Sequence, residues 1–187
     1  MTELAQPSKK RNVRGKSGDV TRDAWVTRKP LAEAIGRVHV DPFSNPYSHI
    51  IADRACMIED GGDGFGGGRP DPGSYKVGGK FPLYGTADEN TLTFIQPGYS
   101  FTPKALLHYQ HTRYIALLRF DPRVDWFKWL YTRVQAIRVL WDASFEPPPG
   151  VEASSNSFPH ALYYRDARDV TDAVRALTFG WTKKRKD

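Results

Sequence analysis

Cysteine is nearly absent from this chain, and its scarcity excludes two kinds of stabilising site. Cys56 is the only cysteine in 187 residues, so neither a disulfide within the chain nor a cysteine-based zinc site is expected. Long apolar runs are missing as well, and no stretch approaches the roughly 18–20 apolar residues of a membrane-spanning helix. We therefore expect no membrane span, and a reducing interior or the inside of a virus particle is the natural environment.

The first residues also lack an apolar segment. Met1 to Gly18 are polar and basic, whereas a secretory signal peptide needs an apolar stretch of about 7–15 residues. Secretion through a signal peptide is thus not expected. The predicted location is the cytoplasm or the interior of a virus particle.

Complete catalytic motifs are missing too. Residues 62–67 (Gly-Asp-Gly-Phe-Gly-Gly) match the spacing of a dinucleotide-binding loop, but residues 68–73 contain two prolines and cannot form the helix that must follow. Gly79-Lys80 is followed by Phe81, where a phosphate-binding loop needs serine or threonine. The patterns H-E-x-x-H and G-x-S-x-G do not occur. We therefore assign no cofactor, no metal and no catalytic residue.

What the chain does contain is enough apolar material for one folded domain. Apolar residues make up 40% of the sequence and aromatic residues 13%, which is too much for a wholly disordered chain. Residues 60–80 hold nine glycines, and such a composition predicts a long loop that is either functional or disordered. The predicted organisation is a disordered basic arm at 1–22, a single α+β domain at 23–182 with the glycine-rich loop at 60–80, and a basic tail at 183–187.

Positive charge is concentrated at the two ends of the chain. Residues 1–30 hold eight bases against three acids, a net charge of +5, and residues 183–187 add +3. Because the whole chain carries +6, residues 31–182 carry about −2. This distribution predicts flexible arms that contact a polyanion, or basic ends that only aid solubility. The predicted nucleic-acid-binding residues are Lys9, Lys10, Arg11, Arg14, Lys16, Lys183, Lys184, Arg185 and Lys186.

The stretch Tyr99–Asp142 carries the strongest hydrophobic periodicity. Thr102-Pro103 and Asp121-Pro122 each resemble a helix start, because a capping side chain precedes a proline whose missing N–H costs nothing there. We predict helices over 103–119 and 122–142.

Shorter elements complete the predicted fold. The pattern indicates helices at 31–35 and 170–179 and strands at 37–40, 81–85, 91–95 and 161–165, while residues 49–59 fit either type. Pro30 and Gly36 delimit the first of these helices, and Asp169 and Gly180 the last. The fold class is therefore α+β, with a small mixed or antiparallel sheet packed on a helix pair in the C-terminal half and disordered basic termini.

Aromatic residues and arginines share the apolar faces of the two predicted helices. An arginine on such a face must pair with a carboxylate, extend to water or contact a partner. Aromatic residues and arginine also dominate the centres of protein interfaces. The predicted partner-binding residues are Trp126, Trp129, Tyr131, Arg133, Trp141 and Arg113. Pairing of these arginines within the fold is the alternative.

Two functional hypotheses follow. The first is a non-enzymatic subunit of a nucleoprotein assembly, such as a virion or a nucleic-acid-processing complex. It would bind DNA or RNA without sequence preference through its basic arms, and protein neighbours through its aromatic helices. The alternative is a small enzyme in which the glycine-rich loop covers a site containing His108 and His111, which are three residues apart on one predicted helix.

Overall fold

The computed structural model describes residues 26–57, 90–98, 101–141, 145–147, 149 and 158–183. The predicted arm at 1–22, the glycine-rich loop at 60–80 and the predicted strand at 81–85 lie outside these residues. Of the basic tail, only Lys183 is described.

A seven-stranded mixed sheet forms the centre of the described domain. Its strands are β2 (Val38–Ser44), β3 (Ala52–Met57), β4 (Leu92–Ile95), β5 (Arg113–Arg119), β6 (Ala136–Leu140), β8 (His160–Tyr164) and β9 (Thr178–Thr182). They lie in the order β3-β2-β4-β5-β8-β6-β9. The first four strands are parallel, and β8, β6 and β9 are each antiparallel to the strand before them in the sheet. The short strands β1 (Val26–Thr27) and β7 (Phe145–Glu146) pair separately.

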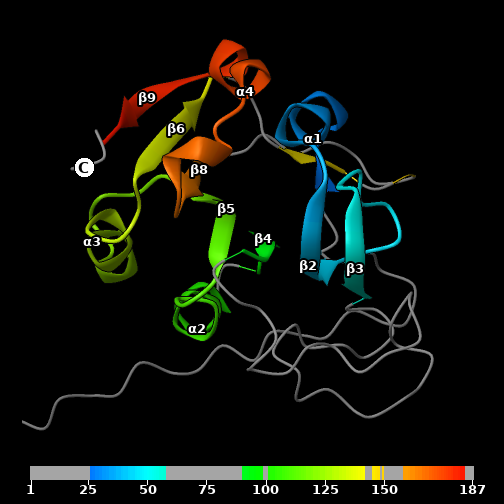
Figure 1. The fold of residues 1–187 in the computed structure, drawn as a ribbon, viewed down its shortest axis with the longest axis horizontal. Helices are drawn as coiled ribbons and strands as arrows, with labels where there is room; N and C mark the ends of the chain where they lie inside the picture. The colour runs from blue at the N-terminus through cyan, green and yellow to red at the C-terminus, as the bar shows by residue number, and fades with distance from the viewer. Residues whose placement is uncertain are drawn as a thin grey trace, which may run out of the picture.

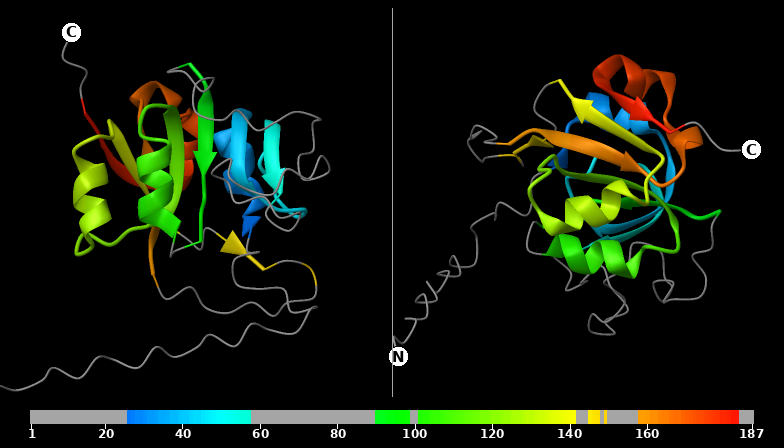
Figure 2. Two further views of the ribbon diagram at one scale, coloured as in Figure 1. Left: turned by 90° about the horizontal axis from the view of Figure 1, so that it is seen from below. Right: turned by 90° about the vertical axis from the view of Figure 1, so that its left-hand side faces the viewer.

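Helices cover both faces of this sheet (Figure 1). On one face lie α1 (Lys29–Ile35) and α4 (Asp172–Leu177), preceded by the 3-10 helix η3 (Ala167–Asp169); on the other lie α2 (Thr102–His108) and α3 (Asp125–Tyr131). The two perpendicular views show the same layering (Figure 2). The expected α+β class is thus confirmed. The predicted packing on one helix pair is not, because short helices lie on both faces of the sheet.

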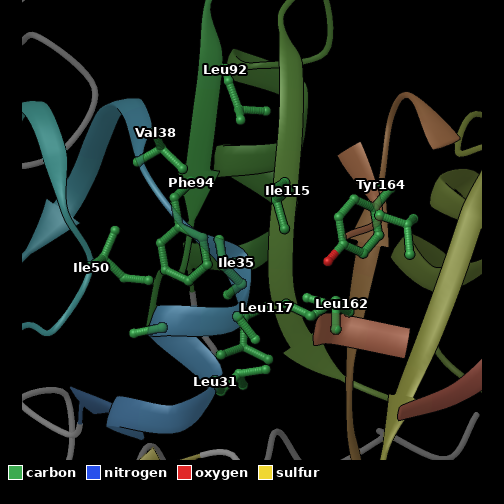
Figure 3. Packing of buried hydrophobic residues seen from close by; sticks show 14 of the residues in the cluster. Leu31, Ile35, Val38, Ile50, Leu92, Phe94, Ile115, Leu117, Leu162 and Tyr164 are labelled. Atoms are coloured by element: carbon green, nitrogen blue, oxygen red, sulfur yellow. The ribbon is translucent and has the colours of Figure 1, made fainter. Parts of the chain in front are cut away.

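Each face of the sheet has its own hydrophobic core. Under α1, Figure 3 shows Phe94, Ile115 and Leu117 from the central strands packed toward Leu31 and Ile35. The adjacent residues of the same strands point to the other face and join a second cluster with α2 and α3. Burial on both faces explains why β5 is apolar over five consecutive residues, a pattern typical of central strands. Each fully buried large side chain contributes roughly 1.5–3 kcal/mol.

The predicted helix over 103–119 is wrong beyond its first turns. The structure has α2 at Thr102–His108, a turn, and then β5 at Arg113–Arg119. Pro103 does lie in the first turn of α2, as expected, but the N-cap residue is Phe101, not Thr102. The run Tyr114–Leu118 has the length and continuous burial of an interior strand, and pairing with β4 and β8 outweighs its apparent helical periodicity.

The predicted helix over 122–142 is wrong in the same way. Asp121 and Pro122 begin a turn, in which the Val124 N–H donates to the Asp121 carbonyl at 3.3 Å. The helix α3 then covers only Asp125–Tyr131, and Ala136–Leu140 forms β6. The β-branched residues Ile137 and Val139 suit a strand, and β6 pairs with β8 on one edge and with β9 on the other.

The first predicted helix is confirmed, and the last is corrected. Pro30 lies in the first turn of α1 and Gly36 ends it with φ of 80°, a backbone conformation that glycine adopts readily. The last helix is shorter than the predicted 170–179, because Thr171 and not Asp169 caps it: the Thr171 Oγ1 accepts from the Val174 N–H at 3.1 Å. Phe179 and Gly180 belong to β9.

The predicted strands that the structure describes are found close to their expected positions. Strands β2, β4 and β8 match the predictions at 37–40, 91–95 and 161–165, with β2 extending to Ser44. The ambiguous stretch 49–59 contains strand β3, at the edge of the sheet beside β2.

Candidate nucleic-acid and partner interface

Arg113 has its partner inside the fold. Its guanidinium forms a two-armed ion pair with Asp169, whose side chain is only 3% exposed. The hydrogen bonds to Asp169 raise the pKa of Arg113 above its ordinary value. This arginine therefore joins the start of β5 to η3, and its charge needs no carboxylate from another molecule.

Seven further cations of the described residues are also ion-paired. Arg119 and Arg123 both bind the buried carboxylate of Asp121. Further pairs within 4.0 Å are Arg37–Asp53, Arg168–Asp166, Arg175–Asp172, Lys128–Asp125 and Lys29–Glu33. Their charges are largely balanced within the protein, so these side chains offer little attraction to a polyanion.

Arg54, on strand β3, is exposed and has no described carboxylate within ion-pair distance, and three further exposed cations share this property. Arg133, Arg165 and Lys183, here called the cation triad, are exposed, and among the described residues none lies within ion-pair distance of a carboxylate. Arg133 was expected from the sequence to lie at an interface and Lys183 to contact nucleic acid. Arg165 was not singled out.

Strand register brings the cation triad together. Ala136, the first residue of β6, is opposite Tyr164 at the end of β8 and opposite Thr182 at the end of β9. Arg165 and Lys183 therefore lie on either side of the turn that joins α3 to β6, because neighbouring strands are about 4.8 Å apart. The Lys183 N–H donates to the Gln135 carbonyl at 2.6 Å, which fixes the point where the basic tail leaves the fold.

The triad also complements the negative end of α3. Arg133 Nη1 donates to the Trp129 carbonyl at 3.0 Å, and Lys183 Nζ lies 3.5 Å from the Tyr131 carbonyl. Arg165 Nη1 donates to the Arg133 carbonyl at 2.5 Å. Since a guanidinium carries five N–H donors, these bonds leave donors of both arginines free to bind anions.

A row of aromatic side chains extends from the triad along β9. Tyr131 and Trp181 meet at 5.3 Å between ring centroids, and Trp141 and Phe179 at 4.3 Å. Phe179 and Trp181 are two residues apart on β9, so both side chains point to the α3 face of the sheet. We call these four side chains the aromatic row. Three are well exposed: Trp141 by 70%, Tyr131 by 45% and Phe179 by 44%.

Lys183 connects the row to the triad. Its Nζ lies 5.7 Å from the Trp181 ring centroid and 6.0 Å from that of Tyr131. At such distances the ammonium is attracted by the aromatic faces. Figure 1 shows β9 at one edge of the sheet, with its C-terminal end toward α3.

Trp126 and Trp129 are less available than the sequence suggested. Trp126 packs on Phe127 and Tyr163, at 6.4 and 6.5 Å between centroids, and contributes to the core beneath α3. Trp129 is partly buried and carries the Arg133 guanidinium 4.2 Å above its ring. Among the predicted interface residues, Tyr131, Arg133 and Trp141 thus present the most accessible surface.

Gly180 allows β9 to lie close to β6. Its φ is 154°, and a Cβ at this position would lie only 2.0 Å from the Ile137 carbonyl oxygen. That oxygen belongs to the backbone of the neighbouring strand and cannot move aside cheaply. The glycine predicted as a helix stop therefore has another role, which is to hold Phe179 and Trp181 on a tightly paired edge strand.

Two buried titratable groups, Asp121 and His160, lie where β5 ends and β8 begins. Hydrogen bonds from Arg123 lower the pKa of Asp121 to about 2, and Arg119 adds to this effect. Burial lowers the pKa of His160 to about 4, assisted by the positive charge of Arg119. Arg119 itself stacks on Phe158 at 3.6 Å from the ring centroid. His160 is therefore a neutral core residue at physiological pH.

The histidines of the alternative enzyme hypothesis do not share a helix. α2 ends at His108, and His111 is exposed in the following turn. His108 packs against Tyr109 at 4.6 Å. The part of the chain that the structure describes contains no group of three or more histidine, cysteine or acidic side chains placed to hold a metal ion. The loop expected to cover the site lies outside that part.

Lys183 is the only predicted nucleic-acid-binding residue within the described ranges. The other eight, at 9–16 and 184–186, lie outside them. No helix among the described residues is long and apolar enough to cross a membrane. The chain matches no protein-family model, no curated protein sequence and no solved structure.

Sequence reasoning missed Arg165, Phe179 and Trp181 as members of this surface. A usable signal was present for two of them. In Thr178-Phe-Gly-Trp-Thr182 the aromatic residues alternate with small or polar ones, which is the period of a strand and not of a helix. Nothing in the sequence places Arg165 beside Arg133, because only the pairing of β8 with β6 makes them neighbours.

Proposed function

We propose that this protein is a non-enzymatic subunit of a nucleoprotein assembly that binds nucleic acid without sequence preference. The observation that carries the proposal is the cation triad, at the point where the basic C-terminal run leaves the fold. Phosphate contacts need cations that are exposed and not already neutralised. The triad meets both conditions, whereas the arginines elsewhere on the described surface mostly bind carboxylates.

The tail adds to this site by its position. Lys183 is held by the Gln135 carbonyl, and residues 184–186 are Lys-Arg-Lys. A basic run that starts beside Arg133 and Arg165 concentrates positive charge in one place on a domain body that is otherwise close to neutral. Protein neighbours in the assembly remain part of the proposal, on the basis of the partly exposed aromatic residues of α3.

The proposal is tested by neutralising the triad and measuring how binding depends on salt. The variant is Arg133→Gln with Arg165→Gln and Lys183→Gln, and the probes are a fluorescent duplex and a single strand of about 16 nucleotides. We expect binding of both probes to weaken. The plot of log affinity against log salt should become shallower by about 2–3, since each lost phosphate contact removes roughly 0.7–0.9 from its slope.

A matched control has the same change in net charge. Lys29→Gln, Arg37→Gln and Arg168→Gln remove three exposed cations that are ion-paired in the fold. This control should bind almost as the wild type does. Equal losses in both triple variants would show that only total charge matters, and no binding of either probe by the wild type at about 50 mM salt would overturn the proposal.

A further inference from the structure

We infer that the aromatic row is a stacking platform for the bases of single-stranded nucleic acid, with the cation triad binding the phosphates at one end. This inference rests on the proposed function and specifies the class of nucleic acid. It also assigns Tyr131 and Trp141 to bases, where the sequence suggested a protein partner. Phe179 and Trp181 join them from β9.

The exposure of the aromatic rings supports this inference. Trp141, Phe179 and Tyr131 are large aromatic residues with 44% or more of their surface exposed, and they gather at one edge of the sheet. Apolar surface of this kind marks an interaction site when it is contiguous. Here two ring pairs follow the same strand, since Phe179 and Trp181 are about 6.6 Å apart along β9.

Positive charge at one end of the row indicates which kind of molecule binds there. The row ends at Lys183, Arg133 and Arg165, and no described carboxylate lies within ion-pair distance of these cations. A protein segment with an apolar stripe would suit the rings but would gain little from three cations. Single-stranded nucleic acid supplies both a flat π-face for each ring and a phosphate for each cation.

Duplex nucleic acid offers the aromatic row no free base faces. In a duplex the base faces are covered by their neighbours, so exposed rings on a sheet edge can contact only its backbone and grooves. Unpaired bases can turn outward and stack on aromatic side chains, with about 1–3 kcal/mol per base. The row should therefore favour single strands, while the triad and tail bind phosphates of either form.

The test removes aromatic character and keeps apolar volume. In the full-length protein, Trp141→Leu with Phe179→Leu should weaken binding of a single strand of about 16 nucleotides by roughly tenfold or more. Duplex affinity and the salt dependence of both probes should stay unchanged. Trp141→Tyr with Phe179→Tyr should restore most of the single-strand affinity. Both positions are exposed, so thermal unfolding should confirm that each variant is folded.

Two exposed aromatic residues elsewhere provide the control. Tyr47→Leu with Phe101→Leu removes rings that are exposed by 41% and 51% and lie outside the row, and it should leave both affinities unchanged. If the wild type binds both probes and the Trp141/Phe179 variant does so equally well, the stacking platform is wrong while the proposed function stands. The same holds if that variant changes only self-association in sedimentation. If the wild type binds neither probe, the proposed function itself is wrong.

Discussion

Arg113 and Arg133 both interrupt apolar sequence, yet the structure uses them in different ways. Arg113 lies at the start of a central strand and binds the buried carboxylate of Asp169. Arg133 follows α3, is exposed, and stacks on Trp129 near two other cations. Several arginines of the domain body are thus neutralised within the fold, whereas Arg133, Arg165 and Lys183 gather without a described carboxylate where α3 meets β6 and β9. Exposed cations beside exposed rings are what the proposed binding surface requires.

The largest expected effect concerns the strand that carries this edge. Gly180→Ala places a Cβ against the Ile137 carbonyl oxygen and requires β9 to move away from β6. We expect a loss of roughly 3 kcal/mol or more in the free energy of unfolding, measured by chemical denaturation. An unchanged midpoint would mean that β9 is not tightly paired. Gly36→Ala, where nothing lies within 4 Å of the added Cβ, separates the cost of positive φ from that of the clash.

We expect the stability of the domain to fall at low pH, because the unfolded chain binds a proton at His160 more readily than the folded protein does. The pKa of His160 is about 4 in the folded protein and about 6.5 when exposed, so the unfolded chain binds the extra proton between these values. The stabilising contribution is complete above pH 6.5 and falls as pH drops toward 4, by roughly 3 kcal/mol. His160→Gln should flatten this part of the stability–pH curve. His111→Gln, at an exposed position, should leave it unchanged.

Arg113 and Arg133 should differ in how much each contributes to the free energy of unfolding. Arg113→Gln leaves the buried Asp169 carboxylate without its cation and should cost roughly 2–3 kcal/mol, less than for a fully buried pair because Arg113 is about a third exposed. Arg133→Gln should change stability by less than about 0.5 kcal/mol. Thermal or urea unfolding of both variants tests the contrast. Equal losses would mean that Arg133 is also structural.

Much of the fold followed from local sequence signals. Pro30 and Gly36 delimit α1 because proline suits a first helical turn and glycine the positive φ after a last one. The alternation around Val38 and Val40 located β2. The extents of the two central helices were wrong because five consecutive apolar residues suit one helix face or a strand buried on both sides. Only the neighbours of Tyr114–Leu118 decide between these.

The candidate site was predictable only in part. The aromatic residues of α3 and Arg133 just after it marked this site, and the basic tail was evident from charge alone. For Arg113, the sequence left open whether the side chain contacts a partner or pairs within the fold, and the structure shows that it pairs with Asp169. Phe179 and Arg165 could not be recognised as neighbours of these residues, because they come from distant segments of the chain. Sheet register brings these segments beside α3 and β6, and Arg165, for example, is 32 residues from Arg133.

By itself the sequence determined the composition, the placement of charge at the ends, the short helix predicted at 31–35 and the α+β class. The tertiary structure decided which residues of Tyr99–Asp142 form strands, which arginines are neutralised, and where the tail begins. The reason is physical: capping and turn preferences act over a few residues, whereas strand pairing and ion pairing depend on residues distant in the chain. The difference between Arg113 and Arg133 is therefore a property of the fold.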